Sequence, residues 1–175
     1  THAGGYTAFA FDVTDLVCAG DNLLEVRADN SHNPDIPPLS ADYTFFGGIY
    51  RDVHLIATDP LHITTTHYAS SGVFLTTERL DASSAEVSVR TLLTNDGPET
   101  ARATVRQRVF DPAGRCIAQT QTSVKLPAGT NGMPVRQSLR IPQPRLWSPD
   151  EPHLYRVESC VIDARGIETD RVANP

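Results

Sequence analysis

Several features that define other protein classes are missing from this sequence of 175 residues. No apolar run approaches the ~20 residues that a membrane-spanning helix needs. The chain has 15 Lys+Arg against 21 Asp+Glu, which gives a formal net charge of -6, and its basic residues do not cluster. Because affinity for phosphate depends on concentrated positive charge, we expect neither a nucleic-acid partner nor a membrane partner.

Cysteine is also scarce, with only Cys18, Cys116 and Cys160 in the chain. An odd count does not make a disulfide framework, and no Cys/His spacing typical of a zinc site is present. Trp147 lies between the last two cysteines, but much nearer the second than in an antibody domain. We therefore favour buried free thiols that act as small hydrophobic residues over a Cys116–Cys160 disulfide.

No segment carries a sustained apolar stripe of helical period, so we expect little helix. Instead, apolar residues alternate with a period of two, as in Thr7, Phe9, Phe11 and Val13. This alternation predicts β-strands. In the first sixty residues the predicted strands include 7–13, 24–28 and 49–58. In the remainder they are 61–68, 73–78, 85–94, 102–110, 115–125, 134–141, 153–162 and 167–172.

The predicted strands are separated by strong turn signals, such as Asp111-Pro112-Ala113-Gly114 and Asp163-Ala164-Arg165-Gly166. Short strands with a turn every 8–12 residues or so are typical of an all-β sandwich. Residues 61–173 have the length of one immunoglobulin-like β-sandwich domain. Residues 1–60 offer about four strands and one proline-rich loop, which are too few to close a sandwich unaided. The chain also begins as if in the middle of a loop, so we expect it to be a piece of a longer protein.

Three strings in the sequence resemble motifs of glycoside hydrolase family 2, the β-galactosidase and β-glucuronidase group. The first runs from His2-Ala3-Gly4-Gly5-Tyr6 to Asp12-Val13-Thr14 and continues at Asp21-Asn22. The second is Gly47-Gly48-Ile49-Tyr50-Arg51-Asp52-Val53. The third is Leu146-Trp147-Ser148-Pro149-Asp150-Glu151-Pro152-His153-Leu154-Tyr155. All three occur in the order and spacing of the family and span nearly the whole chain.

The resemblance implies a domain organisation. Residues 1–60 would be the C-terminal part of a jelly-roll (galactose-binding-like) domain, and residues 61–173 the immunoglobulin-like sandwich that follows it. In this family a (β/α)8 barrel comes next and carries the two catalytic glutamates. A barrel needs roughly 250 residues, which this chain does not hold. We therefore predict no catalytic residue in the chain and no activity for it alone.

Asp42 is the one residue to which the resemblance assigns a functional role. In β-galactosidases of this family, an Asp at the matching distance before the Gly-Gly-Ile-Tyr-Arg-Asp motif reaches into the barrel's active site. There it binds substrate and a monovalent cation, Na or K, while Mg is a further possible cofactor of the intact enzyme. A carboxylate suits sugar hydroxyls and hard cations. The alternative is that Asp42 caps backbone N–H groups of a turn. We expect no cofactor in this chain by itself.

Other chemistry-bearing residues have plainer interpretations. Arg51 and Asp52 are neighbours on a predicted strand, so their side chains should point to opposite faces. We expect Arg51 to pair with an acidic loop residue. His62 and His67 lack metal-ligand spacing, and we interpret both as exposed or as satisfied by ordinary hydrogen bonds.

Trp147, Leu154 and Tyr155 could form a platform on which a sugar stacks. Because the chain has one Trp, we favour a role in closing the core or in a domain interface.

These observations predict a fragment of a family 2 glycoside hydrolase, with a β-galactosidase favoured by Asp42 and its loop. The parent enzyme would bind carbohydrate, namely a β-galactoside, and would form a homo-oligomer. Its localisation stays open between secreted or periplasmic and cytoplasmic. The alternative is an independent carbohydrate-binding or immunoglobulin-type interaction module, since a sandwich fold alone says little about function.

Overall fold

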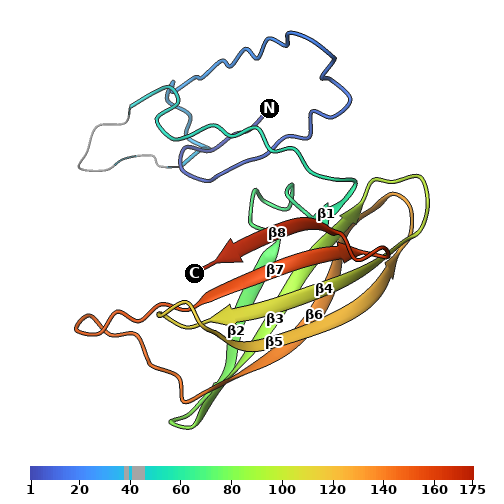
Figure 1. The fold of residues 1–175 in the computed structure, drawn as a ribbon. Coiled ribbons are helices and arrows are strands. Elements are labelled where there is room, and N and C mark those ends of the chain that lie inside the picture. The colour runs from blue at the N-terminus through green and yellow to red at the C-terminus, as the bar shows by residue number, and fades with distance from the viewer. Residues whose placement is uncertain (38–39, 41–45) are drawn as a thin grey trace. The chain divides into compact units, whose positions relative to one another are not determined.

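The computed structural model describes residues 1–37, 40 and 46–175, and it divides into two compact units, Thr1–Ile56 and Ala57–Pro175 (Figure 1). The described residues contain strands, turns and loops and no helix, hence no helix that could span a membrane. The all-β prediction is therefore confirmed.

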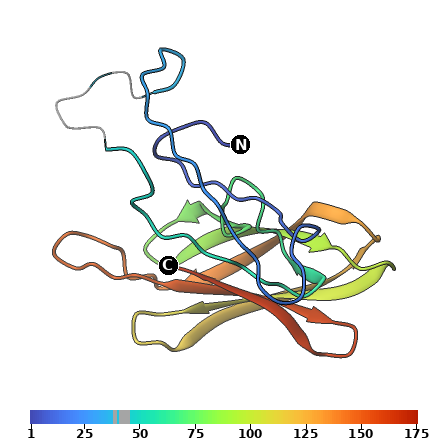
Figure 2. The ribbon, with the colours of Figure 1, turned by 90° about the horizontal axis from the view of Figure 1, so that it is seen from above.

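The second unit contains two antiparallel sheets that lie face to face as layers (Figures 1 and 2). In sheet A, the long strand β3 is central and pairs with β1 and β2 on one side and with β6 on the other. Sheet B has the order β5-β4-β7-β8. The bounds in sheet A are β1 (Leu61–Ile63), β2 (Val73–Leu80), β3 (Ser84–Asn95) and β6 (Thr130–Pro142). Those in sheet B are β4 (Ala101–Phe110), β5 (Cys116–Leu126), β7 (Arg156–Asp163) and β8 (Glu168–Asn174).

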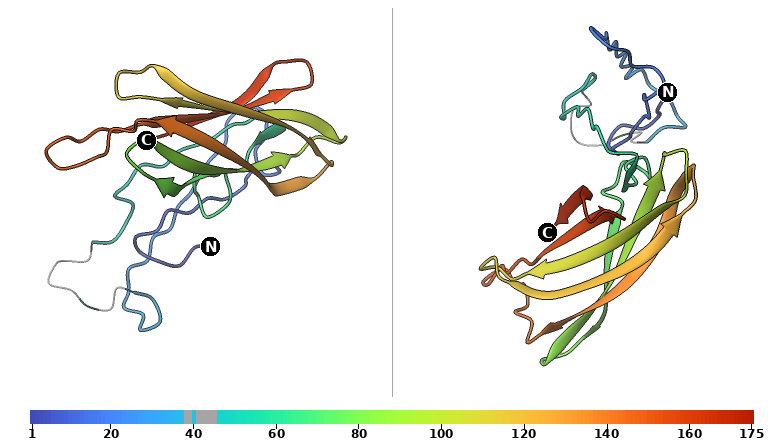
Figure 3. Two further views of the ribbon diagram at one scale, coloured as in Figure 1. Left: turned by 90° about the horizontal axis from the view of Figure 1, so that it is seen from below. Right: turned by 45° about the vertical axis from the view of Figure 1, so that its right-hand side comes forward.

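The core lies between these layers and is built by the alternation that the sequence shows. Along β4 every second residue is buried, beginning at Ala103 and ending at Val109, while the residues between them are more exposed. The facing residues of sheet A include Val89 and Leu93, which are fully buried. Alternate side chains of a strand point to opposite faces, so one face of each sheet closes the core. This arrangement is the immunoglobulin-like sandwich expected for this part of the chain (Figure 3).

The predicted turns are present and are held by side chains. Asp111 accepts hydrogen bonds from the backbone N–H groups of Ala113 and Arg115 in the β4–β5 turn. Asp163 does the same for Arg165 and Ile167 in the β7–β8 turn. An Asp carboxylate that accepts N–H bonds a few residues ahead fixes a tight turn, which is why these sequence signals were reliable.

The predicted strand 61–68 is wrong beyond Ile63, because the chain leaves the sheet there. Tyr68 and Ala69 have φ of 53° and 50°, in the left-handed region that ends regular pairing. Gly72 then brings the chain back with φ +71°, where a Cβ atom would lie 2.5 Å from the carbonyl oxygen of Thr64. We call this connection, residues 64–72, the β1–β2 loop.

The described residues of the first unit form no strand, so the strands predicted over 7–13, 24–28 and 49–58 are wrong for this structure. Their apolar side chains remain exposed, among them Phe9 and Phe11. A strand needs a neighbour for its backbone hydrogen bonds and a layer against which to bury its apolar face. Alternation is present in this unit, but its described residues form no strand pairs. The assignment of residues 1–60 to a jelly-roll domain stays a prediction.

Candidate functional site

Asp42, the residue predicted to bind substrate and a cation, lies outside the described residues. Earlier in the sequence, the side chain of Asn33 accepts a bond of 2.9 Å from the N–H of Asp35, which is an ordinary turn contact. Within the described part of the chain, no group of three or more His, Cys, Asp or Glu side chains could hold a metal ion. The described residues therefore do not by themselves fit the cation, and the role of Asp42 stays a prediction.

Arg51 and Asp52 do not lie on a strand, so the argument from opposite strand faces fails. The guanidinium of Arg51 lies 5.7 Å from the centre of the Tyr50 ring. The Tyr50 hydroxyl donates a long bond of 3.4 Å to the carbonyl of Gly5, and so joins the first and second family-like strings. Arg51 makes no ion pair with an acidic residue in the described ranges, so the expected partner is not found there.

His62 and His67 are both engaged in structural contacts. His62 is buried on β1, with Nδ1 2.9 Å from the carbonyl oxygen of Asp59. His67 lies in the β1–β2 loop. Its ring makes edge-on contacts with the rings of Tyr68 and Phe74, at centroid distances of 4.8 and 5.7 Å. His62 is therefore satisfied by a polar contact, while His67 is half-buried and held by ring contacts.

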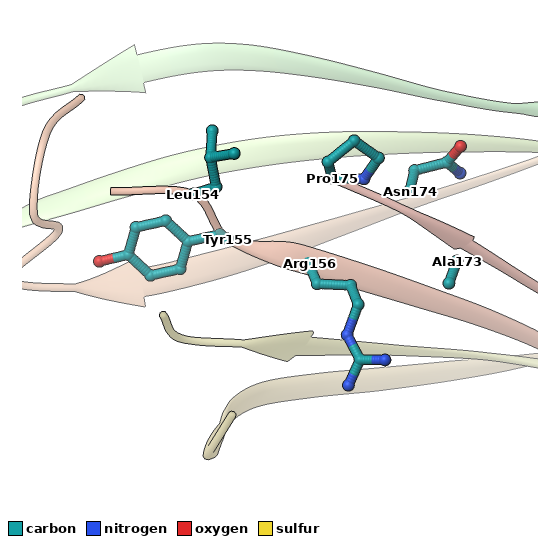
Figure 4. Close-up of a pocket in the computed structure, with 6 residues that line it drawn as sticks. All are labelled: Leu154, Tyr155, Arg156, Ala173, Asn174 and Pro175. Carbon is teal, nitrogen blue, oxygen red and sulfur yellow. The ribbon is translucent and has the colours of Figure 1, made fainter. Parts of the chain in front are cut away.

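A groove lies where β7 begins and β8 ends (Figure 4). Its lining is Leu154, Tyr155, Arg156, Ala173, Asn174 and Pro175. It is open, and none of these six lining residues is an Asp or a Glu. A retaining glycosidase needs two carboxyl groups about 5–5.5 Å apart across the glycosidic bond, and the side chains that line this groove supply neither.

The third family-like string borders this groove and is largely exposed. Trp147 is 59% exposed and Leu154 is 61% exposed. Tyr155 alone packs against the core, and its hydroxyl accepts a bond of 2.9 Å from the N–H of Arg145. The core-closing role expected for Trp147 is therefore wrong in this chain. A domain interface and a stacking platform remain the two open interpretations.

The strongest concentration of charge lies on the outer face of sheet B and was not predicted. Glu158 is buried and lies 2.7, 3.1 and 3.6 Å from the guanidinium nitrogens of Arg108, Arg156 and Arg171. Hydrogen bonds from Arg171 hold the pKa of Glu168 below its usual value. A carboxyl group whose pKa is lowered in this way is a poor general acid, so Glu168 is suited to ion pairing and not to proton donation. The signal was available, since Arg106 and Arg108 alternate with the inward residues of β4.

The three cysteines are free. Cys160 is buried, and burial is the main cause that raises the pKa of its thiol. It is therefore a small hydrophobic residue, as expected, and a poor nucleophile. Cys18 and Cys116 are exposed, so the expectation of burial is wrong for these two.

Comparison with known proteins identifies the family. Residues 66–175, the greater part of the chain, match the model of glycosyl hydrolases family 2. The chain belongs to this family.

Curated relatives cover almost the whole chain. A β-glucuronidase of Bacteroides fragilis is 38% identical over 99% of this chain and 25% of its own length. A β-galactosidase of Rhizobium meliloti is 33% identical over 97% of this chain and 21% of its own length. The family 2 chain thus spans about a quarter or less of the curated relatives that it matches.

Solved structures agree with this assignment. The crystal structure of a Bacteroides uniformis β-glucuronidase matches 84% of this chain and 18% of its own, with a TM-score of 0.79 and 33% sequence identity. The resemblance carried by the three strings is therefore confirmed at the level of the family. The relatives carry two different activity names, so the family alone does not select the sugar.

Proposed function

We propose that this chain is a non-catalytic scaffold of a β-glycosidase that hydrolyses terminal β-galactosides. The scaffold would brace a catalytic barrel and line one side of its pocket. The observation that carries the scaffold role is the state of the described carboxylates. Those of Asp111, Asp163 and Glu158 are engaged in turns and ion pairs. None of them faces a second carboxylate in a pocket.

The preference for β-galactoside rests on Asp42 and the loop that precedes the Gly47-Gly48-Ile49-Tyr50-Arg51-Asp52 string. Its support among the relatives is the β-galactosidase of Rhizobium meliloti. A second candidate, a β-glucuronide substrate, is favoured by the 38% identity to a relative named β-glucuronidase. For the intact enzyme we further propose a homo-oligomer and a bound Na or K ion held partly by Asp42, with Mg as a possible additional ion.

The test compares this chain with the full-length protein that contains it, using p-nitrophenyl β-galactoside and p-nitrophenyl β-glucuronide. We expect turnover of the galactoside by the full-length protein and none by the 175-residue chain. Hydrolysis by the chain alone would contradict the scaffold role. Turnover of the glucuronide only would select the second candidate.

The role of Asp42 has its own test in the full-length protein. The change Asp42→Ala should raise the KM for the galactoside and weaken the response of activity to added Na. If the variant kept the same KM and the same response of activity to Na, the binding role would be rejected in favour of the interpretation that Asp42 caps a turn.

A further inference from the structure

The outer face of sheet A carries two rows of side chains that cross the sheet. In the first row, Phe74 on β2 pairs in register with Arg90 on β3, which pairs with Arg136 on β6. In the next row, Thr76, Ser88 and Ser138 occupy the same three strands. Paired residues point to the same side of a sheet. The inward residues on these strands, such as Val89, fill the core, so the residues of both rows, which alternate with them, face away from it.

The first row has positive charge without an acidic neighbour. The guanidinium of Arg90 lies over the Phe74 ring at 4.4 Å from its centre. Arg136 is exposed, and neither arginine forms an ion pair with any residue in the described ranges. The two rows contain no Asp or Glu. In sheet B, by contrast, four arginines surround Glu158 and Glu168. Sheet A therefore has anion-binding groups with free donors, on a chain whose net charge is -6.

The β1–β2 loop adds an exposed aromatic ring at the end of the first row. Tyr68 is 86% exposed. The Tyr68 ring contacts the ring of His67, which in turn contacts the ring of Phe74. A chain of ring contacts therefore connects Tyr68 with the first row. The carbonyl of His67 accepts bonds from the backbone N–H and the hydroxyl of Ser70, at 3.1 and 2.7 Å, and these bonds hold the turn that presents Tyr68.

These groups match the chemistry of one ligand class. The flat faces of sugar rings stack on exposed aromatic side chains, as apolar surfaces do. Hydroxyl side chains exchange hydrogen bonds with sugar hydroxyls. Guanidinium groups bind carboxylates through charge-assisted hydrogen bonds. We propose that the outer face of sheet A is a binding site for a saccharide that carries carboxylates, a uronate oligosaccharide.

In this site Tyr68 stacks on one sugar ring, and Arg90 and Arg136 bind carboxylates of the neighbouring rings. Ser88, Thr76 and Ser138 bond to ring hydroxyls. The proposal does not require the β-galactosidase assignment, because it concerns binding by this chain alone. It rests on the family only in taking carbohydrate as the class of ligand.

The test is titration calorimetry on the 175-residue chain. The probes are a tetrasaccharide of galacturonate, the same tetrasaccharide with its carboxyls reduced to alcohols, and a tetrapeptide of glutamate. We expect binding of the uronate, much weaker binding of the reduced sugar, and none of the peptide. Equal binding of uronate and peptide would show a general anion site and would overturn the proposal, as would no binding of the uronate.

Variants locate the site. Tyr68→Ala should weaken uronate binding about three- to tenfold by loss of stacking. Arg136→Gln should weaken it about two- to fivefold, as expected for an exposed charge pair, with less effect at high salt. The matched control is Arg102→Gln, which removes the same charge from an exposed position on sheet B. If Arg102→Gln weakened binding as much as Arg136→Gln, or if neither site variant did, the uronate would bind elsewhere and the proposal would fail.

Hydrolysis assays on the full-length protein are independent of this result. If the full-length protein cleaved galactosides but the sheet A variants bound uronate normally, the proposed function would stand and the binding site would be rejected. If the full-length protein cleaved neither substrate but the chain bound uronate through Tyr68 and Arg136, the binding site would be supported and the proposed function rejected.

Discussion

Gln107 is a polar side chain in the middle of an apolar core, fully buried between the two sheets. Its Nε2 donates to Thr91 Oγ1 at 2.9 Å and to Gln137 Oε1 at 3.1 Å. Its Oε1 accepts from the hydroxyl of Ser159 at 2.5 Å. These partners come from β3, β6 and β7, so one residue on β4 ties both layers together. Buried polar groups are tolerated when they are bonded in this way.

The change Gln107→Leu should therefore destabilise the sandwich although it adds an apolar residue to the core. It leaves the Ser159 hydroxyl and the side-chain oxygen Oε1 of Gln137 without their Gln107 partner. We expect this to lower the free energy of unfolding by about 2–4 kcal/mol. Urea unfolding measures this value. Gln119→Leu, an exposed change on β5, is the control and should stay within about 0.5 kcal/mol of the unchanged chain. Equal effects of the two changes would show that the network adds nothing to stability.

Gly72 matters because of its neighbours as well as its backbone. Its φ is +71°, and an added Cβ would lie 2.5 Å from Thr64 O and 2.6 Å from Ile63 Cγ2. Gly72→Ala should lower the free energy of unfolding by about 2–4 kcal/mol, since both strain and overlap act. Gly114→Ala has a similar φ of +79° but nothing within 4 Å, so it should cost only about 1–2 kcal/mol. Thermal unfolding of the two variants compares them directly. Equal losses would mean that the close contact relaxes freely.

At the scale of elements, the β4–β5 and β7–β8 hairpins of sheet B both have turns held by an Asp carboxylate that accepts backbone hydrogen bonds. Hydrogen bonds from the backbone and side chain of Arg115 hold the pKa of Asp111 below its ordinary 3.8. Bonds from Ile167 and Arg165 lower the pKa of Asp163 in the same way. A carboxyl whose folded pKa lies below its unfolded pKa stabilises the fold above the unfolded value, and this stabilisation is lost as the pH falls through the folded value.

The sandwich should therefore lose stability on acidification from about pH 5 downward through 3.8 and below, because each of these carboxyls has the same ordinary value. The double variant Asp111→Asn, Asp163→Asn should be less stable at neutral pH and should show a shallower decline over this window. Unfolding curves from pH 7 to pH 3 provide the measurement. An unchanged slope in the double variant would mean that other carboxyls cause the acid sensitivity.

The sequence predicted elements well where alternation, turn chemistry and a partner strand agree. Strands 85–94 and 102–110 were expected and lie at Ser84–Asn95 and Ala101–Phe110. Prediction failed where alternation lacked a partner, as over 7–13, or where contacts distant in sequence bend the chain. The left-handed backbone at Tyr68 and the network around Gln107 belong to the second class, because neither depends on a local pattern. Asp42, predicted from family resemblance, lies outside the described residues.

At the scale of the whole molecule, the second unit has a complete core of its own. Its buried apolar cluster runs from Leu61 to Val161, and the partly buried residues packed against it end at Val172. The hydrogen bond from Ile63 N–H to Asp170 joins β1 to β8 at 2.8 Å. The first unit contains none of these residues. Stability that comes from burial should therefore reside in Ala57–Pro175.

A chain shortened to residues 57–175 should thus unfold in one cooperative transition, as single domains under about 150 residues usually do. Its midpoint should lie within about 3 °C of that of the longer chain, since a loss of ~1 kcal/mol would shift the midpoint of a domain of this size by ~4 °C. Differential scanning calorimetry on both chains checks this, with Gly72→Ala in each as a control. Because the strain at Gly72 lies inside the sandwich, that change should lower both midpoints equally. A midpoint that fell by 10 °C or so on removal of residues 1–56 would show that the first unit adds substantially to the stability of the sandwich, and the core would not then be self-sufficient.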